Sequence, residues 1–314
     1  MSDYHGTSGD DILEQAGLGL ADGSVIYGGA GNDILILSNG TAVGESGDDI
    51  IVGHASGSAT GYWTSPVAVS VDLLAGLAED GFGGVDVLQN IHSVTGSNYA
   101  DTLLGGSASD SFTGGAGNDS IDGGAGIDTA VSTGIRSHFT LSKTSTGFSL
   151  ADTVAAEGID TLTRIERIKF ADAGIALDVG ATQAAGQTVL LLGAVLPGSL
   201  VFDASKQALL GAAIDLFDQG YSLQTLSGAV TRLPIWDILT GKATPTTTDI
   251  ASYLLTNVNG VAPDATTLAT AVAALASETD FATQGNFLWH LAESAAGQSH
   301  VGLVGLAATG LAYI

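Results

Sequence analysis

Between Asp101 and Asp128 the chain places an aspartate at every ninth position. The last three of these aspartates lie within glycine-rich runs, as in Gly114-Gly115-Ala-Gly117-Asn-Asp119. Glycine permits positive φ angles and lets backbone carbonyls approach an ion closely. Carboxylates and carbonyls together supply the hard oxygen ligands that calcium takes in sets of about six to eight. The spacing therefore predicts a series of calcium sites.

The residues after each aspartate have the pattern of a short strand. Side chains alternate along a strand, so the residue two places after each aspartate points inward. These inward positions are apolar and are expected to stack as a narrow core: Leu103, Phe112, Ile121 and Ala130.

Two units make one coil of 18 residues. Asp101 and Asp119 are then expected above one another on one edge of the stack, and Asp110 and Asp128 on the other. Each pair can share one ion. Without the ion, stacked carboxylates would repel one another.

Three looser copies of the unit lie upstream, at residues 6–13, 28–35 and 44–51. Their aspartates are 22 and then 16 residues apart, so irregular turns must interrupt this first roll. The predicted carboxylate ligands are Asp11, Asp33, Asp49, Asp101, Asp110, Asp119 and Asp128. Backbone carbonyl ligands are predicted near Gly28, Gly29, Gly105, Gly114, Gly117, Gly123 and Gly126.

The charge distribution also points to metal. The net charge is −25, all eight Lys and Arg lie at Arg136 or beyond, and residues 1–135 hold 18 of the 33 acids. Only bound cations can offset the self-repulsion of that first half, so folding is expected to require calcium. The same charge argues against nucleic acid, which requires clustered Lys and Arg, and against anionic lipid.

The nine-residue unit resembles the RTX (hemolysin-type) calcium-binding repeat of secreted bacterial proteins, which folds as a parallel β-roll. This resemblance implies several Ca²⁺ ions and export from a Gram-negative cell by type I secretion, guided by an uncleaved C-terminal signal. The apolar, uncharged segment 305–314 is compatible with such a signal. The absence of cysteine suits a chain exported unfolded.

Two further segments bear on targeting. Residues 1–5 lack the basic and apolar regions of a cleaved signal peptide. No apolar run reaches the roughly 20 residues that span a bilayer, so direct membrane insertion is not expected.

The predicted fold class is multidomain β + α: a calcium-bound parallel β-roll or β-helix with an irregular β insert and a β cap, followed by an all-α helical domain. The predicted segments are a degenerate roll at 1–53, a β-rich insert at 54–95, a regular roll at 96–135, a β cap at 136–182 and a helical domain with the secretion signal at 183–314.

The insert and the cap resemble segments that precede and close RTX repeat blocks. Within the insert and just after it, Asp72, Asp86 and Tyr99 are interpreted as turn residues, with a role as extra ligands as the alternative. The usual Ile-Glu-Asn-Val of such inserts is replaced here by Ile91-His92-Ser93-Val94.

Helical spacing begins with an apolar face that includes Leu209 and Ile214. Asp264 is expected to begin a later helix, and the last helix is expected between Ser299 and Leu311. This helical domain distantly resembles a module of unassigned function in secreted RTX proteins.

No catalytic constellation is evident in the sequence. Gly-x-Ser-x-Gly and His-Glu-x-x-His motifs are absent, cysteine is absent, and the six histidines lack metal-ligand spacing. His290, on an apolar helix, is interpreted as a core or boundary residue. The chain is therefore predicted not to be an enzyme.

The first repeat starts at Gly6, so the N-terminal end of the roll is expected to be open. An open end recruits another chain, and a contact between unlike surfaces of identical chains propagates. The leading hypothesis is a secreted protein that self-assembles into a surface layer, filament or biofilm matrix. Its predicted partners are itself, the type I secretion machinery and cell-surface polysaccharide. The alternatives are an RTX folding and secretion module of a secreted hydrolase, and a calcium-dependent glycan-binding adhesin.

Overall fold

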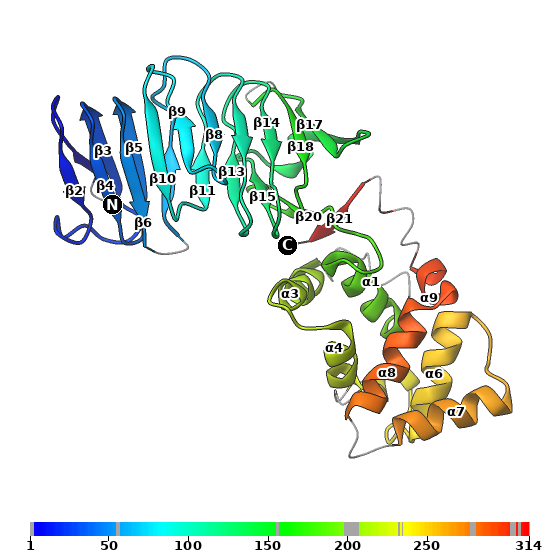
Figure 1. Cartoon of the computed structure of the whole chain (residues 1–314). Coiled ribbons are helices and arrows are strands. Elements are labelled where there is room, and N and C mark those ends of the chain that lie inside the picture. Colours follow the sequence, from blue (N-terminus) through cyan, green and yellow to red (C-terminus); the bar gives the residue numbers. More distant parts are fainter. Residues whose placement is uncertain are drawn as a thin grey trace. The chain divides into compact units, whose positions relative to one another are not determined.

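The structure is a computed structural model in which the chain forms two compact units, residues 1–174 and 175–314. Each unit is described by itself (Figure 1). The division falls inside the segment expected to be the cap. The described residues are 3–54, 57–154, 157–197, 207–231, 233, 235–276, 281–301, 306 and 309–313.

The first unit is built from two long, mostly parallel rows of strands (Figure 1). One row follows the order β1 (Tyr4–His5), β3 (Val25–Ala30), β5 (Thr41–Ser46), β7 (Ala59–Gly61), β11 (Ser93–Thr95), β13 (Ser111–Thr113), β15 (Thr129–Val131) and β19 (Arg167–Lys169). The other follows the order β2 (Ile12–Glu14), β4 (Ile34–Leu37), β6 (Ile50–Gly53), β10 (Val85–Gln89), β9 (Leu77–Glu79), β8 (Ser70–Asp72), β12 (Thr102–Leu104), β14 (Ser120–Asp122), β18 (Ile159–Thr163), β17 (Phe148–Asp152) and β16 (Phe139–Lys143).

The regular repeats form the predicted parallel coil. Leu103 of β12 lies beside Ile121 of β14, and Phe112 of β13 lies beside Ala130 of β15. All four side chains are buried. Successive units therefore alternate between the two sheets, and the apolar positions stack inside the roll as the alternation requires.

The first roll has the same construction despite its uneven spacing. Leu13, Leu35 and Ile51 lie in register across β2, β4 and β6 and are buried. The segments between the strands differ in length, and the strands themselves stay in register. Both sheets continue through the insert, since β7 pairs with β11 in one and β8 pairs with β12 in the other.

The insert and the cap differ from the roll by containing antiparallel pairs. In the insert, β9 pairs antiparallel with both β8 and β10. In the cap, β17 pairs antiparallel with both β16 and β18. Since β10 and β18 also pair in parallel with roll strands, these hairpins extend the sheets.

The second unit is mainly helical. Its helices are α1 (Ala184–Val195), α3 (Gln207–Asp218), α4 (Leu223–Val230), α5 (Trp236–Thr240), α6 (Thr247–Asn259), α7 (Ala265–Leu275), α8 (Phe281–Glu293) and α9 (Ala295–His300). Two short strands, β20 (Gly174–Ala176) and β21 (Leu311–Tyr313), are neighbours in the sheet order. None of the helices in the described part of the chain is long and apolar enough to cross a membrane.

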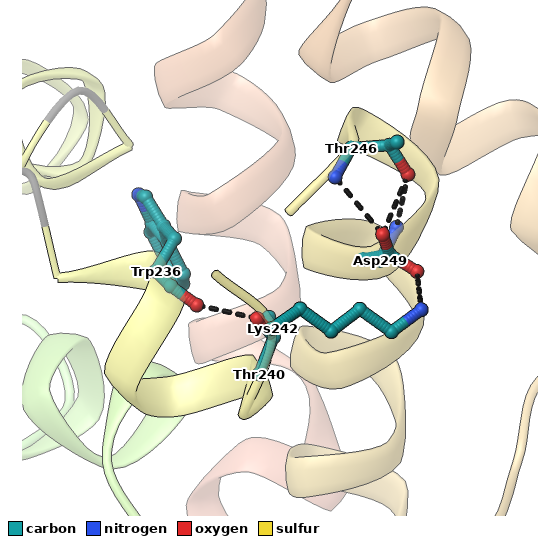
Figure 2. Close-up of polar contacts among 5 residues, drawn as sticks. All are labelled: Trp236, Thr240, Lys242, Thr246 and Asp249. Carbon is teal, nitrogen blue, oxygen red and sulfur yellow. Dashed lines mark hydrogen bonds and ion pairs between the residues drawn. The ribbon is translucent and has the colours of Figure 1, made fainter. Parts of the chain in front are cut away.

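Local side-chain hydrogen bonds determine where several helices begin. Asp264 caps α7 as predicted, accepting from the backbone N–H groups of Thr266 and Thr267. Thr246 and Asp249 form a reciprocal capping box at the start of α6, and Lys242 pairs with Asp249 (Figure 2). At the preceding α5, the hydroxyl of Thr240 donates to the carbonyl of Trp236. These contacts fix the turn between α5 and α6.

One helical expectation needs correction. Leu209, expected to point inward, is 45% exposed, while Leu210, Ile214 and Phe217 form the buried face of α3. The last helix, expected between Ser299 and Leu311, stays a prediction: α9 ends at His300, and Leu306 is helical. Residues 302–305 and 307–308 of that range lie outside the described residues.

Candidate calcium sites

The aspartates of the regular repeats lie directly before strands, where the chain passes from one sheet to the other. The backbone N–H of Asp101 donates to Oδ1 of Asp119 at 2.8 Å, and that of Asp110 donates to Oδ1 of Asp128 at 2.8 Å. The two predicted pairs are therefore brought together, one on each edge of the roll.

The first roll contains the same kind of ladder, that is, a series of aspartates in which the backbone N–H of each donates to the carboxylate of the one in the next coil. The backbone N–H of Asp11 donates to Oδ1 of Asp33 at 2.8 Å, and that of Asp33 donates to Oδ1 of Asp49 at 2.8 Å. Each aspartate thus links its own coil to the next, whatever the number of residues between them.

Each ladder continues into a residue that sequence reasoning missed. Asp86 accepts from the N–H of Asp49 at 3.1 Å, Asp160 from that of Asp119 at 3.0 Å, and Glu166, through Oε2, from that of Asp128 at 2.9 Å. The turn interpretation of Asp86 is wrong, because its side chain is buried within β10. Asp86 belongs to the ladder because Val87 of β10 lies in register with Ile50 of β6.

The other two residues interpreted as turn residues lie outside these ladders. Oδ1 of Asp72 accepts from the N–H of Ala75, a contact within its own turn. Tyr99 is 46% exposed.

A reduced form of the repeat could have revealed two of the missed residues. Gly84-Val-Asp86 and Gly158-Ile-Asp160 retain only the Gly-x-Asp end of the unit. Glu166 carries no such signal, because Arg164 occupies the glycine position and itself adopts a φ of +49°.

The second carboxylate oxygen shows whether calcium fits. Oδ2 is buried and has no hydrogen-bond partner at Asp33, Asp49, Asp119 and Asp128. At the remaining predicted ligands Oδ2 accepts a backbone N–H: Thr7 donates to Asp11, Ser97 to Asp101 and Gly106 to Asp110. A buried carboxylate oxygen without a donor is unfavourable unless it is protonated or binds a cation.

Backbone carbonyls lie beside these carboxylates, and they include that of Gly44, which was not predicted, and that of Gly123, which was. A Cβ placed on Gly28 would lie 2.7 Å from the carbonyl oxygen of Gly44 and would also meet Oδ2 of Asp33. One placed on Gly105 would meet the carbonyl oxygen of Gly123 and lie 3.1 Å from Oδ2 of Asp110. Only glycine leaves this space free for an ion.

The other carbonyls predicted as ligands differ in what lies beside them. Those of Gly28 and Gly114 lie beside Gly6 and Gly96 of the adjacent coil, next to carboxylates, and that of Gly117 lies beside Gly158. Ligation by all of the predicted carbonyls stays a prediction.

Burial raises the pKa of the ladder carboxyls. The pKa rises to about 6 for Asp49, Asp119 and Asp128, and to about 7 for Asp86 and Asp160. The charged forms are thus poorly solvated, and neighbouring aspartates increase the effect. A divalent cation would restore the charged form.

No group of three Asp, Glu or His side chains gathers as a metal cluster in the described residues. The ladders therefore fit an ion held by one or two carboxylates together with backbone carbonyls. That mixture of hard oxygen ligands suits calcium.

One edge of the regular roll starts with a histidine. His92 precedes β11 as Asp110 precedes β13, and its Nδ1 lies 3.0 Å from Oδ1 of Asp110. A cavity of about 240 Å³ adjoins this pair and is also lined by Asn90 and Ser107. His92 therefore takes the ladder position that an aspartate occupies in the following coils.

Comparison with known families agrees with this geometry. A model described as the RTX calcium-binding nonapeptide repeat matches four copies, over residues 18–41 and 95–130. A comparison with curated proteins found no match. The matched residues include Asp33 and all of Asp101, Asp110, Asp119 and Asp128. The chain therefore carries RTX-type nonapeptide repeats, which bind several calcium ions and indicate a secreted protein.

Proposed function

We propose that this chain is a secreted structural protein that folds on calcium after type I secretion and then assembles with copies of itself. The product would be a surface layer, a filament or a biofilm matrix on a Gram-negative cell, with cell-surface polysaccharide as a further partner.

The observation that carries this proposal is the column of buried carboxylates. Asp33, Asp49, Asp119 and Asp128 each keep one buried oxygen without a donor. No Lys or Arg occurs before Arg136, so no basic side chain of that segment can neutralise them. External calcium would therefore act as the folding signal, since its concentration is far higher outside a cell than inside.

The described edge of the first unit supports assembly. β1 pairs with β3 and β2 pairs with β4, and neither has a second partner in the described part of the chain. Ile12 of β2 is 74% exposed. A strand edge with unpaired N–H and C=O groups can add a strand from another chain. If that strand comes from a different surface of an identical chain, the contact propagates.

Assembly is tested by electron microscopy and sedimentation of the purified chain with calcium and with chelator. We expect ordered polymers with calcium and none with chelator. Calcium-loaded protein that is folded but stays monomeric at high concentration contradicts the assembly proposal while leaving calcium-dependent folding intact.

A pair of lysine variants locates the contact. Ile12→Lys places a charge on β2 at the sheet edge, whereas Ile159→Lys places it on β18, between β14 and β17. Both isoleucines are more than half exposed. We expect only Ile12→Lys to raise the protein concentration needed for assembly. Equal effects from the two variants would place the contact elsewhere.

No observation in the described part of the helical unit favours the hydrolase alternative. A polar pocket at His290 would have favoured it. The cavity there, of about 480 Å³, is instead walled mainly by apolar groups that include Phe287, Leu291 and Ala274.

A further inference from the structure

Asp80 lies at the turn between β9 and β10, outside the residues that match the repeat family. It belongs to the insert that replaces a regular repeat turn between β7 and β10. Its side chain is nevertheless as buried as those of the ladder aspartates, with 1% of the residue exposed.

One oxygen of Asp80 is held by three backbone donors. Oδ1 accepts from the N–H groups of Phe82 at 2.8 Å, Gly83 at 2.9 Å and Gly84 at 2.9 Å. The backbone carbonyl of Asp80 also accepts from the hydroxyl of Ser65 at 2.6 Å. The carboxylate is therefore fixed in one orientation by its own turn.

The other oxygen has no donor. Oδ2 of Asp80 is buried without a hydrogen-bond partner. A Cβ placed on Gly84 would lie 2.9 Å from this oxygen and would also meet the carbonyl oxygen of Gly47. The free oxygen of Asp80 therefore faces the last regular turn of the first roll.

That turn carries a second free oxygen. Asp49 follows Gly47 by two residues, and its Oδ2 is likewise buried without a partner. The charge of Asp80 is among those that raise the pKa of Asp49 and Asp86, so the three carboxyls share one region. Asp86 is already satisfied, since its two oxygens accept from the N–H of Asp49 and the hydroxyl of Tyr62.

We propose that Asp80, Asp49 and the carbonyl of Gly47 hold a calcium ion that ties the insert hairpin to the last turn of the first roll. Two carboxylate oxygens and a carbonyl are hard ligands of the kind calcium takes. Burying two unpaired carboxylates near one another is unfavourable, and residues 1–135 offer no Lys or Arg to compensate them.

This site goes beyond the calcium binding of the repeats, because its new ligand comes from a hairpin without the repeat pattern. It explains how the series of buried carboxylates continues into the insert, where the regular turns stop. It does not depend on self-assembly, and loss of assembly would leave the ion count unchanged.

Asp80→Asn tests the site with little disturbance of the turn. The amide oxygen can still accept the three N–H groups, while an NH₂ group replaces the free oxygen and can donate to Asp49 or to Gly47. We expect the variant to bind one calcium ion fewer per chain, measured by equilibrium dialysis with elemental analysis. Its calcium-free form should be at least as stable as that of the unchanged protein, which a merely structural role of Asp80 would not produce.

Glu79→Gln is the matched control, because Glu79 is the exposed residue just before Asp80, at the end of β9, and the change removes the same charge. We expect it to keep the full ion count. The same ion count and affinities in Asp80→Asn and Glu79→Gln would overturn the proposal.

A measurement on the unchanged protein keeps the test independent of the variant's folding. Anomalous diffraction from a calcium-loaded crystal should show a peak between Asp80 and Asp49. A water molecule there, or a hydrogen bond between the two carboxyls in place of an ion, would overturn the site.

Discussion

Four of the ladder aspartates use one oxygen for a hydrogen bond between coils and keep the other free. In Asp119, Oδ1 accepts the N–H of Asp101 in the adjacent coil, while Oδ2 stays free and buried. The hydrogen bond holds the register of the coils, and the free oxygen is the predicted ligand. The same division occurs in Asp33, Asp49 and Asp128.

Replacing Asp119 by Asn separates these two roles. The amide oxygen can still accept from Asp101, but the charged ligand is lost. We expect the calcium-loaded protein to lose about 3–5 kcal/mol of unfolding free energy, as when one partner of a buried charge pair is removed. The calcium-free protein should become no less stable. Denaturant unfolding with and without calcium measures both effects.

Asp22→Asn is the control for this change, since Asp22 is exposed. Its effect should stay within about 0.5 kcal/mol with calcium present. Similar losses in the two variants would mean that net charge, not a particular ligand, stabilises the roll.

The raised pKa values predict that the calcium-free roll is less stable at high pH than at low pH. Burial raises the pKa of Asp119 and Asp128 from 3.8 to about 6 and that of Asp160 to about 7. The folded state therefore binds more protons than the unfolded state between these values. Stability present below the unfolded pKa is lost as the pH rises through the folded pKa.

We expect the calcium-free protein to unfold more readily at about pH 8 than at about pH 5. Calcium favours the ionised carboxylates, so calcium affinity should change in the opposite direction and fall toward pH 5. Thermal unfolding with chelator, paired with calcium titrations at both pH values, checks this. Higher calcium-free stability at pH 8 would contradict the inferred burial of the carboxyls.

At the residue scale, the sequence was informative wherever the repeat was intact. The pairs Asp101–Asp119 and Asp110–Asp128 follow from counting nine residues, because equal spacing returns the chain to the same edge. Asp86 and Asp160 escaped this count because hairpins, not repeat turns, bring them into the columns. Hairpin lengths carry no periodic signal.

At the scale of the element, the turn glycines prevent collision between coils. Gly117 has a φ of +133°, and a Cβ there would lie 2.6 Å from the backbone carbonyl of Tyr99 in the adjacent coil. We expect Gly117→Ala to lower the unfolding free energy of the calcium-loaded protein by about 1–3 kcal/mol from backbone strain, and further from this contact. Denaturant unfolding measures the loss.

Gly9 offers a control at the equivalent position of the first repeat copy. A Cβ on Gly9 has nothing within 4 Å, and its φ lies outside the left-handed region. Gly9→Ala should therefore change stability by less than about 0.5 kcal/mol. A large loss there would show that the glycine is needed for something other than clearance between coils.

The helices show which features a sequence pattern predicts and which it does not. Asp264 caps α7 as predicted, and Ser222 caps α4 in the same way, because a cap is a local contact of two or three residues. By contrast, α1 was not anticipated. It is apolar nearly throughout and mostly buried, so it lacks the polar face that makes an amphipathic helix recognisable.

At the scale of the whole molecule, charge and core are distributed differently between the two units. The first unit combines a narrow core with buried carboxylates and has no basic residue before Arg136. The second has a broad apolar core contributed by α1, α3, α6 and α8, and none of the predicted calcium ligands. Cation dependence should therefore be confined to the first unit.

At about pH 8, where the ladder carboxyls are ionised, chelation is accordingly expected to unfold residues 1–174 and to leave the helices of 175–314 intact. In the described part of residues 175–314 no buried carboxylate oxygen lacks a hydrogen-bond partner, whereas the roll loses the ions that offset repulsion between its stacked aspartates. Circular dichroism should retain the helical signal with chelator. Chymotrypsin should then cut after Phe112, which is fully buried in the folded roll. Restoring calcium should suppress that cleavage. A single transition in which helices and roll unfold together on chelation would show instead that the second unit needs the calcium-bound roll for its own stability.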